Sequence, residues 1–167
     1  MGTYWESRKR LNYYKQVLDF ARQYVPAGRR LLDVGAHNCQ YLAWFDWFDE
    51  KLALDLRWVP KLEGVTGIKG DFMVYEPDAA FDLVLCLQVL EHLDEPAAFC
   101  QKLLTTGHRI IISVPYKWRR GVCADHVQDP VDEHKLRKWA GRPALDQAII
   151  QDGKLRRLVA VYEGAQV

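Results

Sequence analysis

Residues 31–39 read Leu-Leu-Asp-Val-Gly-Ala-His-Asn-Cys, and this stretch predicts the fold of the chain. The run Leu31–Val34 is typical of a buried strand, and the residues after it favour a tight turn and the start of a helix. Gly35 permits a backbone conformation and a close approach that a Cβ atom would obstruct. A strand that leads through a turn into a helix indicates an α/β protein with a parallel sheet.

Two later strands also end in an acidic residue. Asp55 follows the strand at residues 52–54, 22 residues after Asp33, and Asp71 follows a strand around Ile68. Because strand ends of an open α/β sheet gather at one edge, we expect the three carboxylates to surround one nucleotide-like ligand. A turn that leads into a helix N-terminus would offer backbone N–H groups to the anionic part of that ligand.

The remaining segments continue this alternation of helices and strands. Apolar spacing predicts helices over residues 6–25, 39–48, 95–104 (with Asp94 as N-cap) and 130–140. Further strands are predicted at residues 81–87 and 109–114, and Asp152-Gly153 predicts a hairpin between residues 148–151 and 155–162. We therefore expect a doubly wound, seven-stranded, mostly parallel, Rossmann-like sheet that ends in a C-terminal antiparallel hairpin.

Composition limits the class of protein. The chain has 167 residues, the length of one ordinary domain, and a formal charge of +1, which does not favour nucleic acid or a membrane surface as partner. No apolar stretch is long enough to span a bilayer. The four cysteines are widely scattered, which favours reduced thiols and a cytoplasmic location.

The strand-end acids suggest how the ligand would be held. Asp55 can accept both hydroxyls of a ribose, Asp71 can accept from an exocyclic amine, and Phe72 offers a flat wall to an adenine. A nicotinamide dehydrogenase would need Gly-x-Gly-x-x-Gly, whereas Gly35 is followed by Ala-His-Asn-Cys-Gln. We therefore reject the dehydrogenase interpretation.

These residues resemble the class I S-adenosylmethionine-dependent methyltransferases of the small-molecule branch. Residues 31–35 are similar to their first motif, residues 54–56 to the ribose-binding acid, and residues 70–72 to the adenine-binding acid. Residues 81–86 and 89–93 resemble their fourth strand and the helix after it, so the likeness covers residues 31–115 and extends to the hairpin. The resemblance implies S-adenosylmethionine as cofactor, bound by Asp33, Gly35, Ala36, His37, Asn38, Asp55, Leu56, Asp71, Phe72 and Cys86.

The glycine-rich loop departs from the family pattern. His37 and Cys39 occupy positions where the family usually has glycine, and His37 brings a side chain to where the methionine moiety would approach the backbone. Either a wider loop binds the cofactor through Asn38 and backbone N–H groups, or the affinity has decayed. We expect the wider loop.

Two histidines are candidates for acceptor chemistry. His126 lies between Asp125 and Asp129, and a neighbouring carboxylate can orient an imidazole and stabilise its charged form. His92, in the segment after the fourth strand, is the second candidate for the catalytic role. A metal site made of His126, Asp129 and His134 has no recognised ligand spacing, so we predict none.

Two basic, aromatic segments flank the predicted core. The N-terminal one is either a lid over an acceptor or a packing face with a solvated edge. The segment at residues 117–120 could recognise a phosphate or carboxylate. Their members are Tyr4, Trp5, Arg8, Lys9, Arg10, Tyr13 and Tyr14 in the first, and Lys117, Trp118, Arg119 and Arg120 in the second.

The resemblance implies one methyltransferase domain: an N-terminal helix or lid (1–28), a cofactor-binding core (29–115) and an acceptor side (116–167). We expect methyl transfer from S-adenosylmethionine to a small-molecule acceptor, such as a hydroxyl of a sugar or another metabolite. Residues 86–89 read Cys-Leu-Gln-Val instead of the Asn/Asp-Pro-Pro-Tyr/Phe of nucleic-acid amine methyltransferases. Two alternatives stay open: a non-catalytic binding or scaffold subunit, and an RNA- or protein-directed methyltransferase. A partner subunit that completes the acceptor pocket also stays open.

Overall fold

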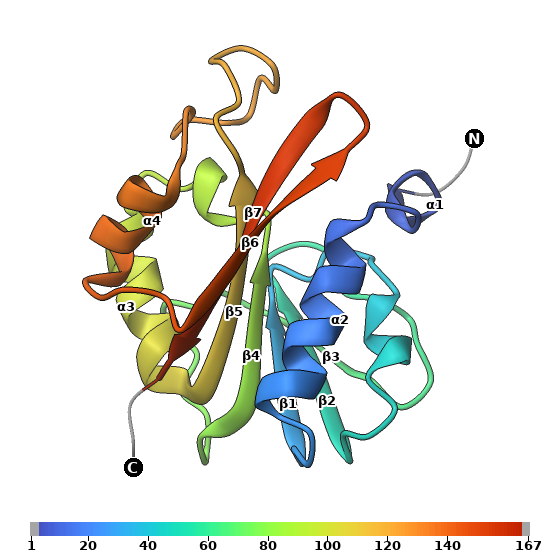
Figure 1. Cartoon of the computed structure of the whole chain (residues 1–167). Helices are drawn as coiled ribbons and strands as arrows, with labels where there is room; N and C mark the ends of the chain where they lie inside the picture. The colour runs from blue at the N-terminus through green and yellow to red at the C-terminus, as the bar shows by residue number, and fades with distance from the viewer. Residues whose placement is uncertain (1–3, 165–167) are drawn as a thin grey trace.

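A computed structural model of the chain describes residues 4–164, which build one seven-stranded sheet with helices on both faces (Figure 1). The strand order is β3-β2-β1-β4-β5-β7-β6, in which β1 to β5 are parallel and β7 runs antiparallel to β5 and to β6. This confirms the predicted fold class. The strands are β1 (Arg30–Val34), β2 (Glu50–Asp55), β3 (Thr66–Lys69), β4 (Phe81–Leu87), β5 (Gly107–Pro115), β6 (Asp146–Asp152) and β7 (Leu155–Glu163).

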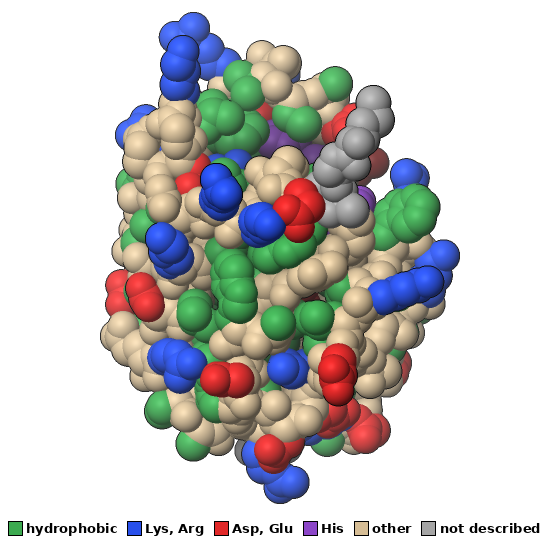
Figure 2. Space-filling model, turned by 90° about the vertical axis from the view of Figure 1, so that its right-hand side faces the viewer, with side chains coloured by type: hydrophobic (Ala, Val, Ile, Leu, Met, Phe, Trp, Pro, Cys, Tyr) green, Lys and Arg blue, Asp and Glu red, His purple; other side chains and the backbone are tan. Residues whose placement is uncertain are grey.

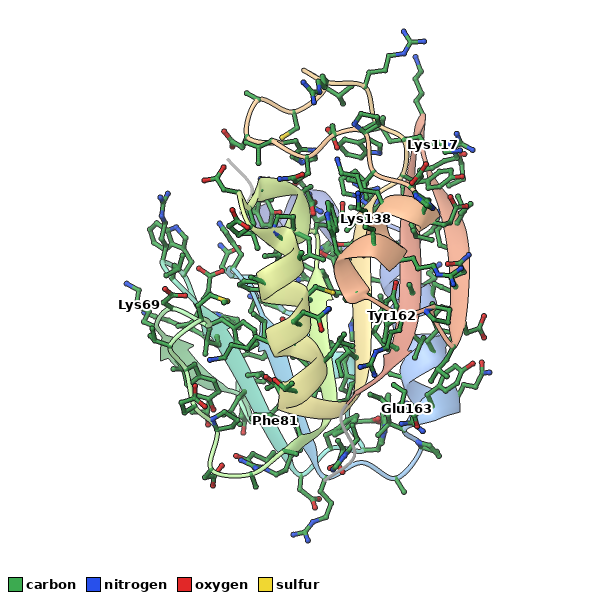
Figure 3. All side chains as sticks on the ribbon, turned by 90° about the vertical axis from the view of Figure 1, so that its left-hand side faces the viewer. Lys69, Phe81, Lys117, Lys138, Tyr162 and Glu163 are labelled. Carbon is green, nitrogen blue, oxygen red and sulfur yellow. The ribbon has the colours of Figure 1, made fainter. Side chains whose placement is uncertain are left out.

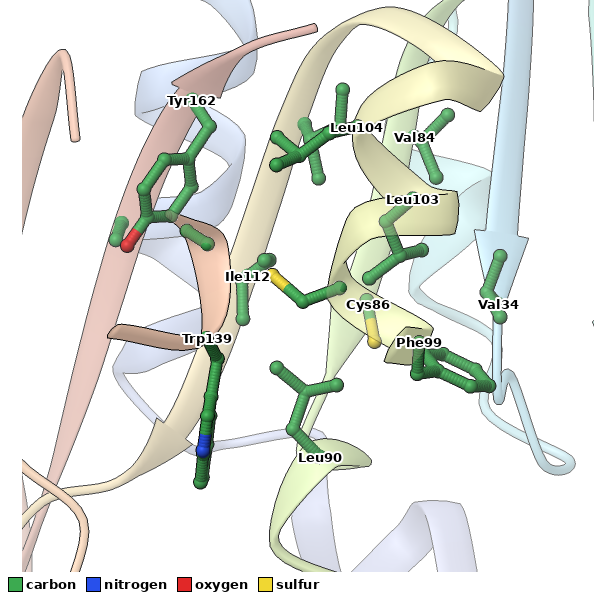
Figure 4. Packing of buried hydrophobic residues seen from close by; sticks show 14 of the residues in the cluster. Val34, Val84, Cys86, Leu90, Phe99, Leu103, Leu104, Ile112, Trp139 and Tyr162 are labelled. Carbon is green, nitrogen blue, oxygen red and sulfur yellow. The ribbon is translucent and has the colours of Figure 1, made fainter. Parts of the chain in front are cut away.

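The helices divide the core into two layers. Helix α2 (Tyr13–Tyr24) covers one face, and α3 (Pro96–Thr106) and α4 (Glu133–Ala140) cover the other, where Figure 3 shows them in front of the sheet. Neighbouring residues of a strand point to opposite faces. Leu31 therefore packs in the cluster with α2, whereas Leu32 packs in the cluster with α3 and α4. Figure 4 shows the second cluster, in which Cys86 lies among Leu103, Phe99 and Ile112.

The predicted N-terminal helix is divided. A short α1 (Tyr4–Arg8) is separated from α2, which begins only at Tyr13. The start of α2 is fixed by Asp152 at the tip of the hairpin, whose carboxylate accepts from the backbone N–H groups of Asn12 and Tyr13. A carboxylate is favoured at a helix N-terminus because the first N–H groups lack partners within the helix. Asp152 also pairs with Arg157 at 3.0 Å, and both side chains are buried.

The helix predicted over residues 39–48 is wrong. Only one 3-10 turn, η1 (Tyr41–Trp44), forms there. Aromatic rings explain the difference, since Tyr41, Phe45 and Phe48 are all buried, and the ring of Tyr41 packs 4.9 Å from that of Tyr14. Burying the rings against the N-terminal segment outweighs the local helical spacing.

Other element boundaries also differ from the prediction. Glu95, not Asp94, is the N-cap of α3, and its side chain makes no capping hydrogen bond. Helix α4 begins at Glu133 instead of Pro130, because Asp132 caps it by accepting from the N–H of Lys135. In the hairpin, Asp152 pairs with Leu155 in the ladder, so the turn residues are Gly153 and Lys154. Within residues 4–164, no helix has the length and apolar character needed to cross a membrane.

Replacing Asp152 by Asn tests the contact that holds α2 to the hairpin. The substitution keeps the shape but leaves Arg157 as an uncompensated buried cation, so we expect the free energy of unfolding to fall by about 3–5 kcal/mol. The measurement is urea denaturation followed by circular dichroism. Asp46→Asn is the matched control, since its pair with Arg22 is 3.1 Å long but exposed, and we expect a loss below about 1 kcal/mol. Equal losses in the two variants would contradict this role for Asp152.

Candidate functional site

The carboxyl ends of β1, β2 and β4 border an open cavity of about 420 Å³, here called the larger cavity. The N-terminal segment closes one side of it. Figure 2, which views this side of the molecule, shows histidine side chains set back among hydrophobic ones near the top, the end to which β4 and β5 point in Figure 1. The walls of the larger cavity are made of Tyr4, Arg8, Tyr13, Tyr14, Gly35, Ala36, His37, Cys39, Tyr41, Asp55, Leu56, Arg57, Leu87, Gln88, Val89, His92 and Leu93.

A second cavity of about 120 Å³, here called the smaller cavity, lies directly beside the larger one. The two share Gly35, Asp55, Leu56, Val89 and Leu93 as lining residues. The walls of the smaller cavity are mostly apolar, with Asp71 as the acid added to Asp55. The two cavities together can hold an elongated ligand with a flat apolar end, a middle part beside Asp55 and a polar end.

Asp55 stands at the junction of the two cavities and is fixed by three backbone N–H groups. Its Oδ2 accepts from His37 at 3.0 Å, and its Oδ1 accepts from Arg57 at 2.8 Å and Trp58 at 3.1 Å. These bonds join the turn after β1 to the turn after β2. Oδ2 retains a lone pair that can accept from a ligand hydroxyl.

The turn after β1 has a glycine-like backbone at two positions. Gly35 has φ +79°, and a Cβ atom there would lie 2.4 Å from Cγ2 of Val89. His37 has φ +50°, a region that residues with a Cβ adopt uncommonly. Its ring turns away to lie 4.4 Å from the ring of Tyr4. The loop thus keeps the backbone path of a glycine loop although it carries a histidine.

The turn does not offer the backbone donors that we expected. The N–H groups of Gly35 and Ala36 donate to the carbonyl of Leu54, and that of His37 donates to Asp55. The expected α-helix N-terminus is replaced by η1. Asn38 lines neither cavity, and its Oδ1 lies 2.9 Å from Nδ1 of His37. These N–H groups and the Asn38 side chain thus bond within the protein, and the expectation that they bind the ligand stays a prediction.

Arg8 brings the positive charge that the turn does not supply. Its side chain lines the larger cavity and lies 5.0 Å from the ring centroid of Tyr4. Nη2 makes a long 3.5 Å bond to the Tyr13 hydroxyl, and the buried Nε has no hydrogen-bond partner among residues 4–164. The sequence pointed to this segment through its mix of aromatic and basic residues but did not distinguish Arg8 from Lys9 and Arg10.

Asp33 lies beneath the site and not in it. It is fully buried, lines neither cavity, and accepts from the hydroxyl of Tyr41, a residue of the larger cavity. Its Oδ1 has no partner within the described chain. Burial, reinforced by the nearby charge of Asp55, raises the pKa of Asp33 to about 7 although the Tyr41 bond opposes the shift. Asp33 therefore reaches the cavity only through Tyr41, and its own contact with a ligand stays a prediction.

The other expected residues fall into two groups. Asp71 and Phe72 line the smaller cavity: Asp71 is exposed and accepts from the N–H of Met73, whereas Phe72 is buried, with its ring 4.9 Å from that of Phe99. Cys86 is completely buried in the α3 layer and lines neither cavity (Figure 4). Cys86 packs in the same layer as Phe72 and Phe99, which line the smaller cavity, but it does not reach either cavity, and its contact with a ligand stays a prediction.

The two candidate histidines lie together but only one faces a cavity. His92, at the end of the 3-10 turn η2 (Leu90–His92), lines the larger cavity, and its Nδ1 is 3.0 Å from the carbonyl of Asp125. The His126 ring lies edge-on, 4.7 Å from that of His92, and does not line the larger cavity. Its Nδ1 lies 2.8 Å from Oδ2 of Asp129. His134 is exposed on α4 and lines a different cavity. Of the two candidates, His92 is thus the one that lines the larger cavity.

The second basic, aromatic segment is used for structure. Trp118 donates from Nε1 to the carbonyl of Arg156 and stacks on the His126 ring at 5.4 Å, and Arg120 donates to the carbonyl of Asp129. These contacts join the loop at residues 116–132 to β7 and brace it internally. None of residues 117–120 lines the two cavities, so the proposed recognition of a phosphate or carboxylate at this site is not supported.

Gln88 is a cavity residue that the sequence did not identify. It follows β4 with φ +59°, its N–H donates to the carbonyl of Ser113, and its Oε1 accepts from Nε of Arg157. Positive φ at non-glycine residues is costly and occurs where the surrounding structure imposes it. The residue type alone carries no such signal.

The comparisons with known proteins agree with this architecture. The family of the methionine biosynthesis protein MetW matches residues 15–152. A ubiquinone biosynthesis O-methyltransferase of Xylella fastidiosa (strain 9a5c) is 32% identical in an alignment of 118 positions that covers 58% of this chain and 46% of that protein. The chain therefore spans about half the length of this relative.

Solved methyltransferases share the fold. The 1,6-didemethyltoxoflavin-N1-methyltransferase of Burkholderia thailandensis, with bound S-adenosylhomocysteine, has a TM-score of 0.73 at 18% identity, over 95% of this chain and 80% of that one. The N-methyltransferase NodS of Bradyrhizobium japonicum WM9, also with S-adenosylhomocysteine, has a TM-score of 0.72 at 12% identity, over 93% and 87%. The magnesium protoporphyrin IX methyltransferase of Synechocystis PCC 6803 has a TM-score of 0.71 at 14% identity, over 99% of this chain and 89% of that one.

The raised pKa of Asp33 predicts a pH dependence of stability. Asp33 ionises near pH 4 when the chain is unfolded but only near pH 7 when folded, so the unfolded state loses its proton first. The free energy of unfolding should therefore decrease as pH rises from 4 to 7, by a few kcal/mol, since one pKa unit equals about 1.4 kcal/mol. Asp33→Asn, which still accepts from Tyr41, should show a smaller decrease, because the buried Glu91, with its pKa raised to about 8, still contributes one. Parallel urea titrations of the two proteins between pH 4 and 8 give the comparison, and identical slopes would exclude Asp33 as the cause.

Proposed function

The chain belongs to the family of the methionine biosynthesis protein MetW and has the class I methyltransferase fold, and from this premise we propose that it binds S-adenosylmethionine and methylates a small molecule. The carboxylate of Asp55, held between two adjoining cavities, is the observation that carries the proposal. S-adenosylmethionine has its ribose between an adenine and a charged methionine part. The smaller cavity suits the adenine and the larger one suits the methionine part.

The cofactor contacts follow from this placement. Asp55 would accept from a ribose hydroxyl, while Asp71 and the edge of Phe72 would meet the adenine. Gly35, Ala36 and Leu56 would provide the walls beside the ribose. Arg8 would bind the carboxylate of the methionine part, because its guanidinium lies in the larger cavity and its buried Nε has no partner in the described chain.

The chain's residues would orient and shield the reaction. S-adenosylmethionine supplies an activated methyl group, so the protein has to align the acceptor with it and exclude water. The aromatic rings of Tyr4, Tyr13 and Tyr14 form an apolar side of the larger cavity suited to that task.

We assign to His92 the role of the base that accepts the proton of a hydroxyl acceptor. Because the carbonyl of Asp125 can only accept, Nδ1 of the neutral ring carries the proton and Nε2 is free to accept one. Burial lowers the pKa of His92 below its usual value, which keeps the ring neutral at pH 7. His126 would act as a positioning residue through its contact with the His92 ring. An oxygen acceptor is also in line with the name of the Xylella relative, an O-methyltransferase.

One observation favours the non-catalytic alternative. In a glycine loop that binds this cofactor, free backbone donors would be useful, and here the N–H groups of Gly35, Ala36 and His37 are already bonded within the protein. A scaffold subunit with a class I fold would need no cofactor. Direct titration separates it from the proposed enzyme.

Calorimetric titration with S-adenosylmethionine and S-adenosylhomocysteine tests the cofactor site. We expect one equivalent to bind, and Asp55→Ala to weaken the affinity about 10- to 100-fold, the loss of a hydrogen bond to a charged group. Asp49→Ala, at an exposed carboxylate paired with Arg29, is the matched control and should bind like the natural chain. Absence of binding by the natural chain would favour the scaffold alternative.

His92→Gln tests the proposed base. With sugars and phenols as acceptors and release of S-adenosylhomocysteine as readout, we expect kcat to fall about 10²- to 10⁴-fold with little change in cofactor affinity. In the natural chain, kcat should rise with pH to a plateau, because only neutral His92 accepts the proton. This rise should be absent in His92→Gln. Unchanged activity, or an unchanged pH profile, would remove His92 from the mechanism, and His134→Gln serves as the control histidine.

A further inference from the structure

We propose that Glu91, His92 and His126 form a binding site for a divalent transition-metal ion at the edge of the larger cavity. One ligand atom from each residue lies within 4.8 Å of the others, and Oε1 of Glu91 is 4.0 Å from Nε2 of His92. Metal–nitrogen and metal–oxygen bonds are about 2.0–2.2 Å long, so an ion would need only a small inward movement of these side chains.

The carboxylate of Glu91 is the observation that points to a ligand. Its side chain is fully buried, and neither Oε1 nor Oε2 has a hydrogen-bond partner among residues 4–164. A buried carboxylate without a partner is costly. The nearest second acid, Asp129, is also buried and keeps one oxygen without a partner in the described chain. A bound cation would therefore offset the cost of burying these two acids.

Both histidines are oriented as metal ligands usually are. Nδ1 of His126 is bonded to Oδ2 of Asp129 at 2.8 Å, and Nδ1 of His92 is bonded to the carbonyl of Asp125 at 3.0 Å. These bonds leave Nε2 of each ring available. Metal-binding histidines typically give their other ring N–H to a carboxylate or a carbonyl, which fixes the ring and increases its basicity.

Tertiary structure brings the three residues together. Glu91 and His92 lie on η2, and His126 lies on the loop at residues 116–132. The loop is fixed to η2 because the N–H groups of Val127 and Gln128 both donate to the carbonyl of Glu91. The sequence analysis grouped His126 with Asp129 and His134, which are its neighbours in the chain. In the structure, His134 lies on α4 and lines a different cavity.

The donor atoms select the ion. Two imidazole nitrogens and one carboxylate suit Zn²⁺, Co²⁺, Fe²⁺ or Mn²⁺, whereas Mg²⁺ and Ca²⁺ prefer oxygen ligands throughout. Three protein ligands leave coordination positions open. Since His92 lines the larger cavity, an open position there would bind an oxygen of the acceptor, and this last step rests on the proposed function. His92 would then act on the acceptor through the ion.

Titration of the metal-stripped full chain with Co²⁺ tests the site. The ion has visible absorption bands that report nitrogen coordination, and we expect one equivalent to bind, with no comparable binding of Mg²⁺. Glu91→Gln and His126→Gln should each lower the affinity for Co²⁺ at least 10-fold. His134→Gln, an exposed histidine outside the cluster, should leave it unchanged.

Two controls keep the outcomes distinct. The buried substitution Glu91→Gln could prevent folding, which far-UV circular dichroism would reveal. His92 is partly exposed, so His92→Gln should lose affinity for Co²⁺ while the chain stays folded. Asp55→Ala should lose S-adenosylhomocysteine binding but keep Co²⁺ binding, so failure of the cofactor site would not affect this result. Absence of Co²⁺ binding by the folded chain, or an equal loss in His134→Gln, would overturn the proposed metal site.

Discussion

The three backbone hydrogen bonds to Asp55 are the constraint on which the site depends. They join the turn after β1 to the turn after β2, and they fix one carboxylate where the smaller and larger cavities meet. The turn can reach Asp55 only because its backbone takes positive φ at Gly35 and His37. A side chain at Gly35 would collide with Val89, which lines both cavities.

The N-terminal segment compensates for what this turn lacks. A short 3-10 turn stands where a full helix would cover the sheet, and α1 with its aromatic residues fills that space. The same segment brings Arg8 to the larger cavity, so positive charge comes from a side chain and not from a helix N-terminus. The buried Asp152–Arg157 pair fixes the start of α2 and links this arrangement to the terminal hairpin.

The acceptor side is organised around η2. The loop at residues 116–132 folds back onto Glu91, which places the His126 ring against the His92 ring and leaves the carboxylate of Glu91 buried beside them. The proposed base and the proposed metal ion use the same Nε2 of His92, so an ion bound there would replace direct proton acceptance by that atom. Both explanations depend on that loop remaining docked. The N–H groups of Val127 and Gln128 dock the loop on Glu91. Trp118 and Arg120, whose basic and aromatic character had suggested recognition of a ligand, join the loop to β7 and brace it internally.

The sequence by itself determined the strands and their order along the chain, the antiparallel hairpin and the places of Asp55, Asp71 and Gly35 after their strands, because apolar periodicity and turn chemistry are local. Only the tertiary structure decided that Asp33 and Cys86 are completely buried and line neither cavity, because packing between segments far apart in the chain sets how deep a side chain lies. It also decided that Arg8, Gln88 and Glu91 lie at or beside the site. Their positions depend on contacts between segments far apart in the chain, such as η2 with residues 127–128, and no local pattern encodes such contacts.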